Sequence, residues 1–131
     1  MIHFVGAGSG APDLITVRGQ KFLREADVVI YAGSLVNPEL LKETKPGCEI
    51  LNSAYMTLDE VIRAMEKAER EGKMTVRLHT GDPALYGAIR EQMDAMDRLG
   101  ISYDICPGVS SFCGAAAALG MEYTLPGVSQ S

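Results

Sequence analysis

Short segments of β-favouring residues alternate with longer amphipathic segments along almost the whole chain. The short segments that we expect to be strands are residues 2–5, 27–31, 49–51, 74–79 and 103–106. Each is followed by a segment that we expect to be helical: residues 15–25, 38–41, 58–71, 84–99 and 109–119. Five strand–helix units in succession are typical of a parallel sheet with helices on both faces. The pattern therefore predicts a three-layer α/β fold around a five-stranded parallel sheet.

Caps and apolar spacing support the two longest predicted helices. Thr57 followed three residues later by Glu60 forms a capping-box pattern at the start of the third helix. In the fourth, Gly100 is a candidate terminator. The apolar positions of this fourth predicted helix recur at helical spacing: Leu85, Ala88, Ile89, Met93 and Met96. The first helix is expected to start near Thr16.

Composition indicates one domain with an ordinary core and excludes several classes of partner. The chain has 131 residues, of which 47% are hydrophobic, and its apolar runs are too short for a membrane helix. Lysine and arginine total 12 against 17 acidic residues, without a dense basic run, which argues against binding to nucleic acid. The three cysteines form no CxxC pair, so we expect buried free thiols and no metal site. We infer a cytoplasmic protein that binds neither membranes nor nucleic acid.

The last residues differ from the rest of the chain. Residues 123–131 carry no charged side chain, contain Pro126 and Gly127, and end without a terminating element. We therefore expect a domain over residues 1–122, with residues 123–131 as the start of a connection to a further domain.

In a parallel sheet, ligands bind outside the carboxyl ends of the strands, so the loops that follow the strands are the candidate functional segments. Three loops stand out: "GAGSGAPD" after the first strand, "HTGDPALYG" after the fourth and "PGVSS" after the fifth. Each contains glycine, which allows close approach of a ligand to the backbone.

The first loop fits a loose dinucleotide-binding pattern, because Gly6, Gly8 and Ala11 have the spacing GxGxxG/A. That pattern also requires a helix that opens inside the motif and an acidic residue at the end of the second strand. Here Pro12 extends the loop, and Asp27 lies at the wrong end of its strand. Two interpretations remain: a turn that needs positive φ angles, or close approach of a flat or bulky ligand.

The other two loops combine turn residues with polar side chains. Pro83 is expected in the first turn of the following helix, which makes Asp82 either its N-cap or a contact for a polar ligand. His79, at the end of an apolar strand, is more typical of a hydrogen-bonded structural histidine than of a base. Ser110 and Ser111 lie near the start of the fifth helix, where capping explains one of them.

Together these loops resemble the tetrapyrrole methylase family, whose members transfer a methyl group from S-adenosylmethionine to a tetrapyrrole. The family signature GxGxGxxxxLT is matched by Gly6, Gly8, Gly10 and Thr16, with Ile15 in place of the usual leucine. Further stretches, "YAGSLV", "SAYMTLDE" and "RLHTGDPALYGAIREQM", are most similar to members that methylate carbon 11 of a precorrin-4 or cobalt-precorrin-4 macrocycle in cobalamin biosynthesis. The resemblance covers the whole chain but only the first half of the family's proteins.

The resemblance implies a set of binding residues but singles out no catalytic residue. The S-adenosylmethionine contacts fall on Ser9, Thr80, Gly81, Asp82, Leu85, Ser110 and Ser111, and Gly6, Gly8 and Gly10 line the tetrapyrrole trough. The family commonly has proline at the position of Ser9 and aspartate at that of Ala11. Members bind the cofactor in a cleft between two α/β domains, usually as homodimers, so we expect the 131-residue chain alone to be inactive.

Two other functions remain as alternatives. One is a dinucleotide-binding oxidoreductase domain, for which the glycine pattern of the first loop is the argument. The other is a binding or assembly module without catalytic activity, because only half of the family's cleft is present.

Overall fold

Five parallel strands form the centre of the molecule, as the sequence predicts. The computed structural model describes residues 1–85 and 88–124. Its strands are β1 (Ile2–Gly6), β2 (Val28–Tyr31), β3 (Glu49–Asn52), β4 (Thr75–His79) and β5 (Tyr103–Cys106). They are arranged in the order β3-β2-β4-β1-β5, so β4 is the central strand and pairs with β2 on one side and β1 on the other. In this register Gly6 pairs with His79, which brings the loops after β1 and β4 together.

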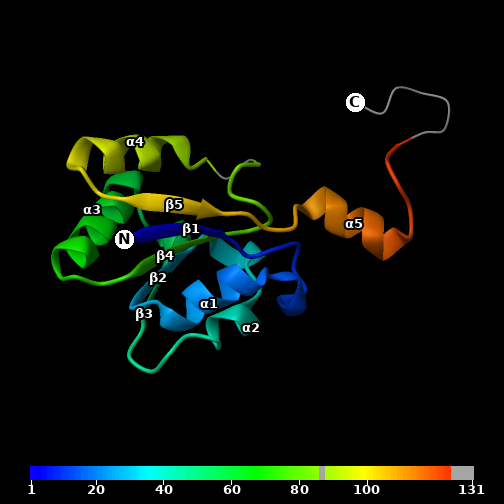
Figure 1. The fold of residues 1–131 in the computed structure, drawn as a ribbon, viewed down its shortest axis with the longest axis horizontal. Coiled ribbons are helices and arrows are strands. Elements are labelled where there is room, and N and C mark those ends of the chain that lie inside the picture. The colour runs from blue at the N-terminus through cyan, green and yellow to red at the C-terminus, as the bar shows by residue number, and fades with distance from the viewer. Residues whose placement is uncertain (86–87, 125–131) are drawn as a thin grey trace.

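In the described part of the chain, four helices cover the two faces of the sheet, and a fifth lies beyond its carboxyl edge. Helices α1 (Val17–Glu25) and α2 (Pro38–Leu41) lie on one face. Helices α3 (Leu58–Arg70) and α4 (Arg90–Leu99) lie on the other. Helix α5 (Ser111–Leu119) projects away from the sheet in Figure 1 and buries only Ala116. Among residues 1–85 and 88–124, three short 3-10 helices occupy loops: Pro12–Leu14, Gly33–Leu35 and Ser53–Tyr55.

Alternation along the strands divides the core into two clusters. Phe4 and Ile30 point to the α3 and α4 face, where they pack with Met65 and Met96. On the other face the strands contribute a second set of side chains to the core around α1 and α2: Val5, Val29, Val76 and Leu78. Successive side chains of a strand point to opposite faces. The side chains of Arg77 and His79 in β4 therefore point toward α3 and α4.

The predicted caps are present. Thr16 caps α1 by accepting a hydrogen bond from the Gly19 N–H. Thr57 and Glu60 form the complete capping box at the start of α3. Gly100 ends α4 in the left-handed conformation, with φ at +70°.

The prediction of a helix over residues 84–99 is wrong at its N-terminal end, because α4 begins only at Arg90. Ala88 has a φ of +52°, a left-handed backbone conformation that a right-handed helix cannot contain. The N-cap of α4 is therefore Ile89 and not Asp82, and Leu85 lies in the turn that precedes the helix.

The expectation for the cysteines needs adjustment. Cys106 is buried and Cys48 half-buried, but Cys113 is exposed on α5, so the prediction of three buried thiols is wrong for Cys113.

Among the residues that the structure describes, no helix is long and apolar enough to span a membrane. Most of the predicted connection over residues 123–131 lies outside the described residues.

A junction of bare backbone holds the three loops at the carboxyl edge of the sheet. Gly8 and Gly81 form an isolated antiparallel bridge, in which the Gly81 N–H donates to the Gly8 carbonyl at 2.8 Å and the reverse bond is 3.3 Å. Gly81 takes a φ of +66°, and its carbonyl lies over Gly6 and Gly108. A Cβ on Gly6 would lie 2.5 Å from the Gly81 carbonyl oxygen and 2.7 Å from the Gly108 Cα. We name Gly6, Gly8, Gly81 and Gly108 the glycine junction.

We expect Gly6→Ala to lower the free energy of unfolding by about 3 kcal/mol, because the added methyl group meets backbone that no side-chain rotation can move. Urea denaturation monitored by circular dichroism measures this loss. Gly47→Ala is the control, because Gly47 has a φ of +84° but open space around it. Its expected loss is about 1 kcal/mol. A loss in Gly6→Ala no larger than that of the control would contradict the steric role of the junction.

Candidate functional site

A cavity of about 230 Å³ lies at the carboxyl edge of the sheet, where the loops after β4 and β5 meet. We call it the β4–β5 pocket. It is lined by Leu35, Thr80, Gly81, Asp82, Leu85, Ser110, Ser111 and Phe112. The structure thus brings together in one cavity six of the seven residues that the family resemblance assigns to the cofactor. These six come from two loops that are far apart in the sequence, and the glycine junction sets the loops side by side.

The β4–β5 pocket combines polar groups with apolar side chains. Asp82 is half-buried, and its Oδ1 accepts a hydrogen bond of 2.8 Å from the Ala84 N–H, which fixes the carboxylate within the turn before α4. Ser110 is buried at the N-cap of α5, but its hydroxyl makes no capping hydrogen bond. Capping therefore does not explain Ser110, and its hydroxyl is available to a ligand.

Ser9 lies against α5 and not in the lining of the β4–β5 pocket. Its side chain packs on Gly114, where a Cβ would collide with the Ser9 hydroxyl and Cβ. Ser9 therefore connects the first loop to the helix that carries Ser111, and its role toward the cofactor stays a prediction.

The three glycines assigned to the macrocycle occupy the first loop. Gly6 and Gly8 are buried in the glycine junction, while Gly10 is half-buried with a φ of +123°. The Asn37 Nδ2 donates to the Gly10 carbonyl at 2.8 Å and so anchors the loop to the start of α2. The positive φ angles of Gly8 and Gly10 confirm that the loop needs glycine for its turns. Their contact with a tetrapyrrole stays a prediction.

Two apolar residues of the β4–β5 pocket were missed by sequence reasoning. Leu35 is 75% exposed and Phe112 is 51% exposed, although both are large and hydrophobic. Leu35 belongs to the loop that directly follows β2, and Phe112 follows the two serines. Their position after strands was the available signal, because that is where ligands bind in a parallel sheet.

A second cavity, of about 380 Å³, lies on the α3 and α4 side of the same strand end. We call it the β2–β4 pocket. It is lined by Ala32, Leu58, Arg77, His79, Ala88, Arg90, Glu91 and Gln92. Arg77 is 6% exposed; its Nε donates to the Gln92 Oε1 at 3.0 Å and its Nη1 to the Ile30 carbonyl at 3.2 Å. Sequence reasoning did not single out Arg77, because a strand arginine gives no sign of its burial.

His79 differs from the hydrogen-bonded structural histidine that we expect from the sequence. The ring is 4% exposed, and its Nε2 has no hydrogen-bond partner among the described residues. Burial, together with the positive charge of Arg77, lowers the pKa of His79 from 6.5 to about 3. The imidazole is therefore neutral at physiological pH, with one nitrogen as donor and the other as acceptor.

The described residues contain no group of three or more histidine, cysteine, aspartate and glutamate side chains that could hold a metal ion. The polar groups that line the two pockets are hydroxyl, carboxylate, guanidinium, imidazole, amide and backbone groups.

Comparison with known proteins gives a consistent result over the whole chain. The family model for tetrapyrrole (corrin/porphyrin) methylases matches residues 1–131. Cobalt-precorrin-4 C(11)-methyltransferase of Methanocaldococcus jannaschii is 58% identical, over 99% of this chain and 50% of that enzyme. Precorrin-4 C(11)-methyltransferase of Mycobacterium tuberculosis is 48% identical, over 99% of this chain and 52% of that enzyme. The chain thus spans about half the length of the curated relatives it matches.

Solved structures share the fold. A cobalt precorrin-4 methyltransferase from cobalamin biosynthesis superimposes with a TM-score of 0.95 at 52% identity, over 99% of this chain and 54% of that one. A uroporphyrin-III C-methyl transferase from Thermus thermophilus, complexed with S-adenyl homocysteine, gives a TM-score of 0.79 at 30% identity, over 99% of this chain and 52% of that one.

We expect the free energy of unfolding to fall as the pH drops below 6.5, because the unfolded chain then binds a proton on His79 that the folded chain does not accept until about pH 3. The expected slope from this one group is about 1.4 kcal/mol per pH unit. Urea denaturation of the natural chain and of His79→Gln between pH 7 and pH 4.5 measures it. The variant should show the shallower dependence, and identical slopes would contradict the buried neutral state of His79.

Proposed function

Because the chain belongs to the tetrapyrrole methylase family, we propose that it provides the N-terminal half of an S-adenosylmethionine-dependent C-methyltransferase. The substrate class is a precorrin-4 or cobalt-precorrin-4 macrocycle of cobalamin biosynthesis, and the position methylated is carbon 11. The names of its relatives support this proposal. We further propose that the two-domain enzyme is cytoplasmic and forms a homodimer.

The observation that carries the cofactor assignment is the convergence of six predicted residues on the β4–β5 pocket. Their chemistry fits S-adenosylmethionine. The Asp82 carboxylate suits a cationic group, and the hydroxyls of Thr80, Ser110 and Ser111 suit polar groups of the nucleoside and amino acid. Leu85 and Phe112 supply apolar surface for a flat base. The relative solved with S-adenyl homocysteine supports the same class of cofactor.

The proposed reaction depends on alignment more than on a reactive side chain. The cofactor supplies a methyl group that its sulfonium already activates. The chain's own part is to fix the cofactor and the macrocycle in line, and orientation of this kind contributes on the order of 7–11 kcal/mol to lowering a barrier. Rigid backbone serves this purpose, and the glycine junction holds the loops of the β4–β5 pocket by two backbone hydrogen bonds.

The dinucleotide alternative has weaker support. The first loop does not open into a helix at its glycines: the 3-10 helix Pro12–Leu14 intervenes, and α1 begins only at Val17. A pyrophosphate at Gly6–Gly10 would therefore not face a helix N-terminus. The relatives found are methyltransferases, which also makes a non-catalytic module the less favoured proposal.

We expect Asp82→Ala to weaken binding of S-adenosylhomocysteine by about tenfold, which corresponds to one charge-assisted hydrogen bond. Isothermal titration calorimetry measures the affinity on the chain fused to the C-terminal half of the Methanocaldococcus jannaschii relative, so that the cleft has both walls. Asp94→Ala is the matched control, because Asp94 is exposed on α4 and does not line the β4–β5 pocket.

The affinities of the two variants for S-adenosylhomocysteine distinguish the possible functions. An affinity that falls in Asp82→Ala but not in Asp94→Ala supports the cofactor site. Unchanged affinity in a folded Asp82→Ala protein counts against it. Binding of a nicotinamide dinucleotide, without binding of S-adenosylhomocysteine, would favour the oxidoreductase alternative instead.

A further inference from the structure

The floor of the β2–β4 pocket holds a buried cation whose charge is not balanced. Within the described part of the chain, the Arg77 guanidinium donates only to neutral oxygens, the Gln92 Oε1 and the Ile30 carbonyl. It forms no ion pair with any carboxylate in residues 1–85 and 88–124. Burial lowers the pKa of Arg77 to about 10, so the group remains a cation at neutral pH. A buried charge without a counter-charge is costly, and an anion in the adjoining cavity would offset that cost.

His79 adds a second polar group to the same wall. It lies two residues after Arg77 on β4, so both side chains are on one face of the sheet. Its buried Nε2 is unpartnered within the described part of the chain. A neutral imidazole beside a cation is poorly suited to bind a metal ion, but its N–H group can donate a hydrogen bond to an anion.

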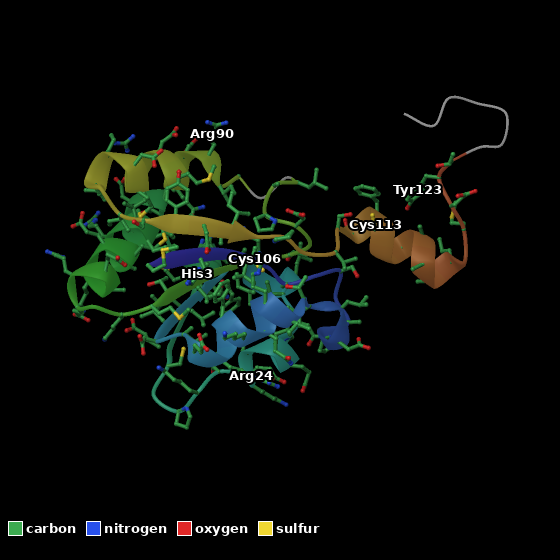
Figure 2. The ribbon with its side chains drawn as sticks, in the orientation of Figure 1. His3, Arg24, Arg90, Cys106, Cys113 and Tyr123 are labelled. Carbon is green, nitrogen blue, oxygen red and sulfur yellow. The ribbon has the colours of Figure 1, made fainter. Side chains whose placement is uncertain are left out.

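The mouth of the pocket is formed by the first turn of α4. This helix has ten residues, and its N-cap, Ile89, contributes no side-chain cap, so the N-terminal N–H groups and the positive end of the helix dipole adjoin the cavity. Figure 2 shows Arg90 at this end of α4, with its side chain directed away from the sheet. Glu91 is the one acidic residue among the described lining residues, and its negative charge favours a ligand of single rather than double negative charge.

We propose that the β2–β4 pocket binds one carboxylate side chain of the tetrapyrrole, with Arg77 as the main contact and His79 and Gln92 as positioning residues. This inference rests on the proposed function, because it takes the macrocycle as the ligand. A planar guanidinium matches a carboxylate, whereas a phosphate dianion would meet Glu91. The apolar residues Ala32, Leu58 and Ala88 suit the methylene groups that carry such a carboxylate.

The location of the pocket agrees with this assignment. His79 lines the β2–β4 pocket, and the next residue, Thr80, lines the β4–β5 pocket proposed for the cofactor. The carboxyl end of β4 therefore contributes lining residues to both cavities. A carboxylate held on the α3 and α4 side would fix the rotation of the macrocycle relative to the cofactor, so Arg77 would determine specificity as well as affinity.

The test uses the 131-residue chain and uroporphyrin, an octacarboxylate porphyrin, as the probe. Fluorescence titration measures its affinity, and NMR follows the imidazole signals of the two histidines. His79 should shift on binding, whereas His3 should not, because its ring is held by Asp104 and stacked on Phe22. Arg77→Met should weaken uroporphyrin binding about tenfold to hundredfold, the effect of removing a charge-assisted contact. In Arg77→Lys, which keeps the charge but loses the planar fork, we expect a smaller loss.

Three controls make the result specific. Arg24→Met removes the same charge from the opposite side of the molecule, where Arg24 pairs with Glu43, and should leave the affinity unchanged. A porphyrin that carries cationic groups should not shift His79. Inorganic phosphate and acetate, each added alone, distinguish a macrocycle site from a site for small free anions.

Uroporphyrin binding that is lost in Arg77→Met but kept in Arg24→Met, with a shift at His79 alone, supports the proposal. Equal affinity in the two variants overturns it, as does a His79 shift with phosphate or acetate but not with uroporphyrin. Absence of uroporphyrin binding to the natural chain also overturns it. None of these results bears on S-adenosylhomocysteine binding in the β4–β5 pocket, so the proposed function fails or stands by its own measurement.

Discussion

The backbone bridge between Gly8 and Gly81 is the contact on which the β4–β5 pocket depends, because Gly81 lines that pocket. It joins the loop after β1 to the loop after β4, and the Gly81 carbonyl then packs on Gly6 and Gly108. No side chain fits in this space, so the loops approach as closely as backbone allows. The chain can place polar groups from distant segments around one cavity because this junction removes the freedom of the loops that carry them.

The alternation of side chains along β4 explains why two different cavities lie at the end of this strand. Arg77 and His79 point toward α3 and α4, while the loop that starts at Thr80 turns toward Ser110 and Ser111. The first cavity has a cationic floor, and the second has a carboxylate and hydroxyls. A cofactor with a cationic sulfonium and a substrate with carboxylates need opposite electrostatic environments. We propose that the two faces of one strand end serve these two ligands.

The sheet and most helix ends could be predicted because local signals determine them. Thr57 with Glu60, Thr16 and Gly100 act through hydrogen bonds within a few residues of themselves. The start of α4 could not, because the left-handed backbone of Ala88 is unusual for a residue with a Cβ and leaves no mark in the apolar spacing. The environment of Arg77 depends on Gln92 and on the Ile30 carbonyl, contacts that exist only after the sheet and α4 have packed. The six residues of the β4–β5 pocket were named from resemblance, and their convergence on one cavity is what the structure adds.

The central claim is that the β4–β5 pocket holds the methyl donor. A crystal structure of the chain, fused to the C-terminal half of a close relative and grown with S-adenosylhomocysteine, tests it most directly. We predict electron density for the ligand between the loop that carries Thr80 to Asp82 and the start of α5 at Ser110 and Ser111. Density for the ligand elsewhere, with the β4–β5 pocket filled only by solvent, would contradict it.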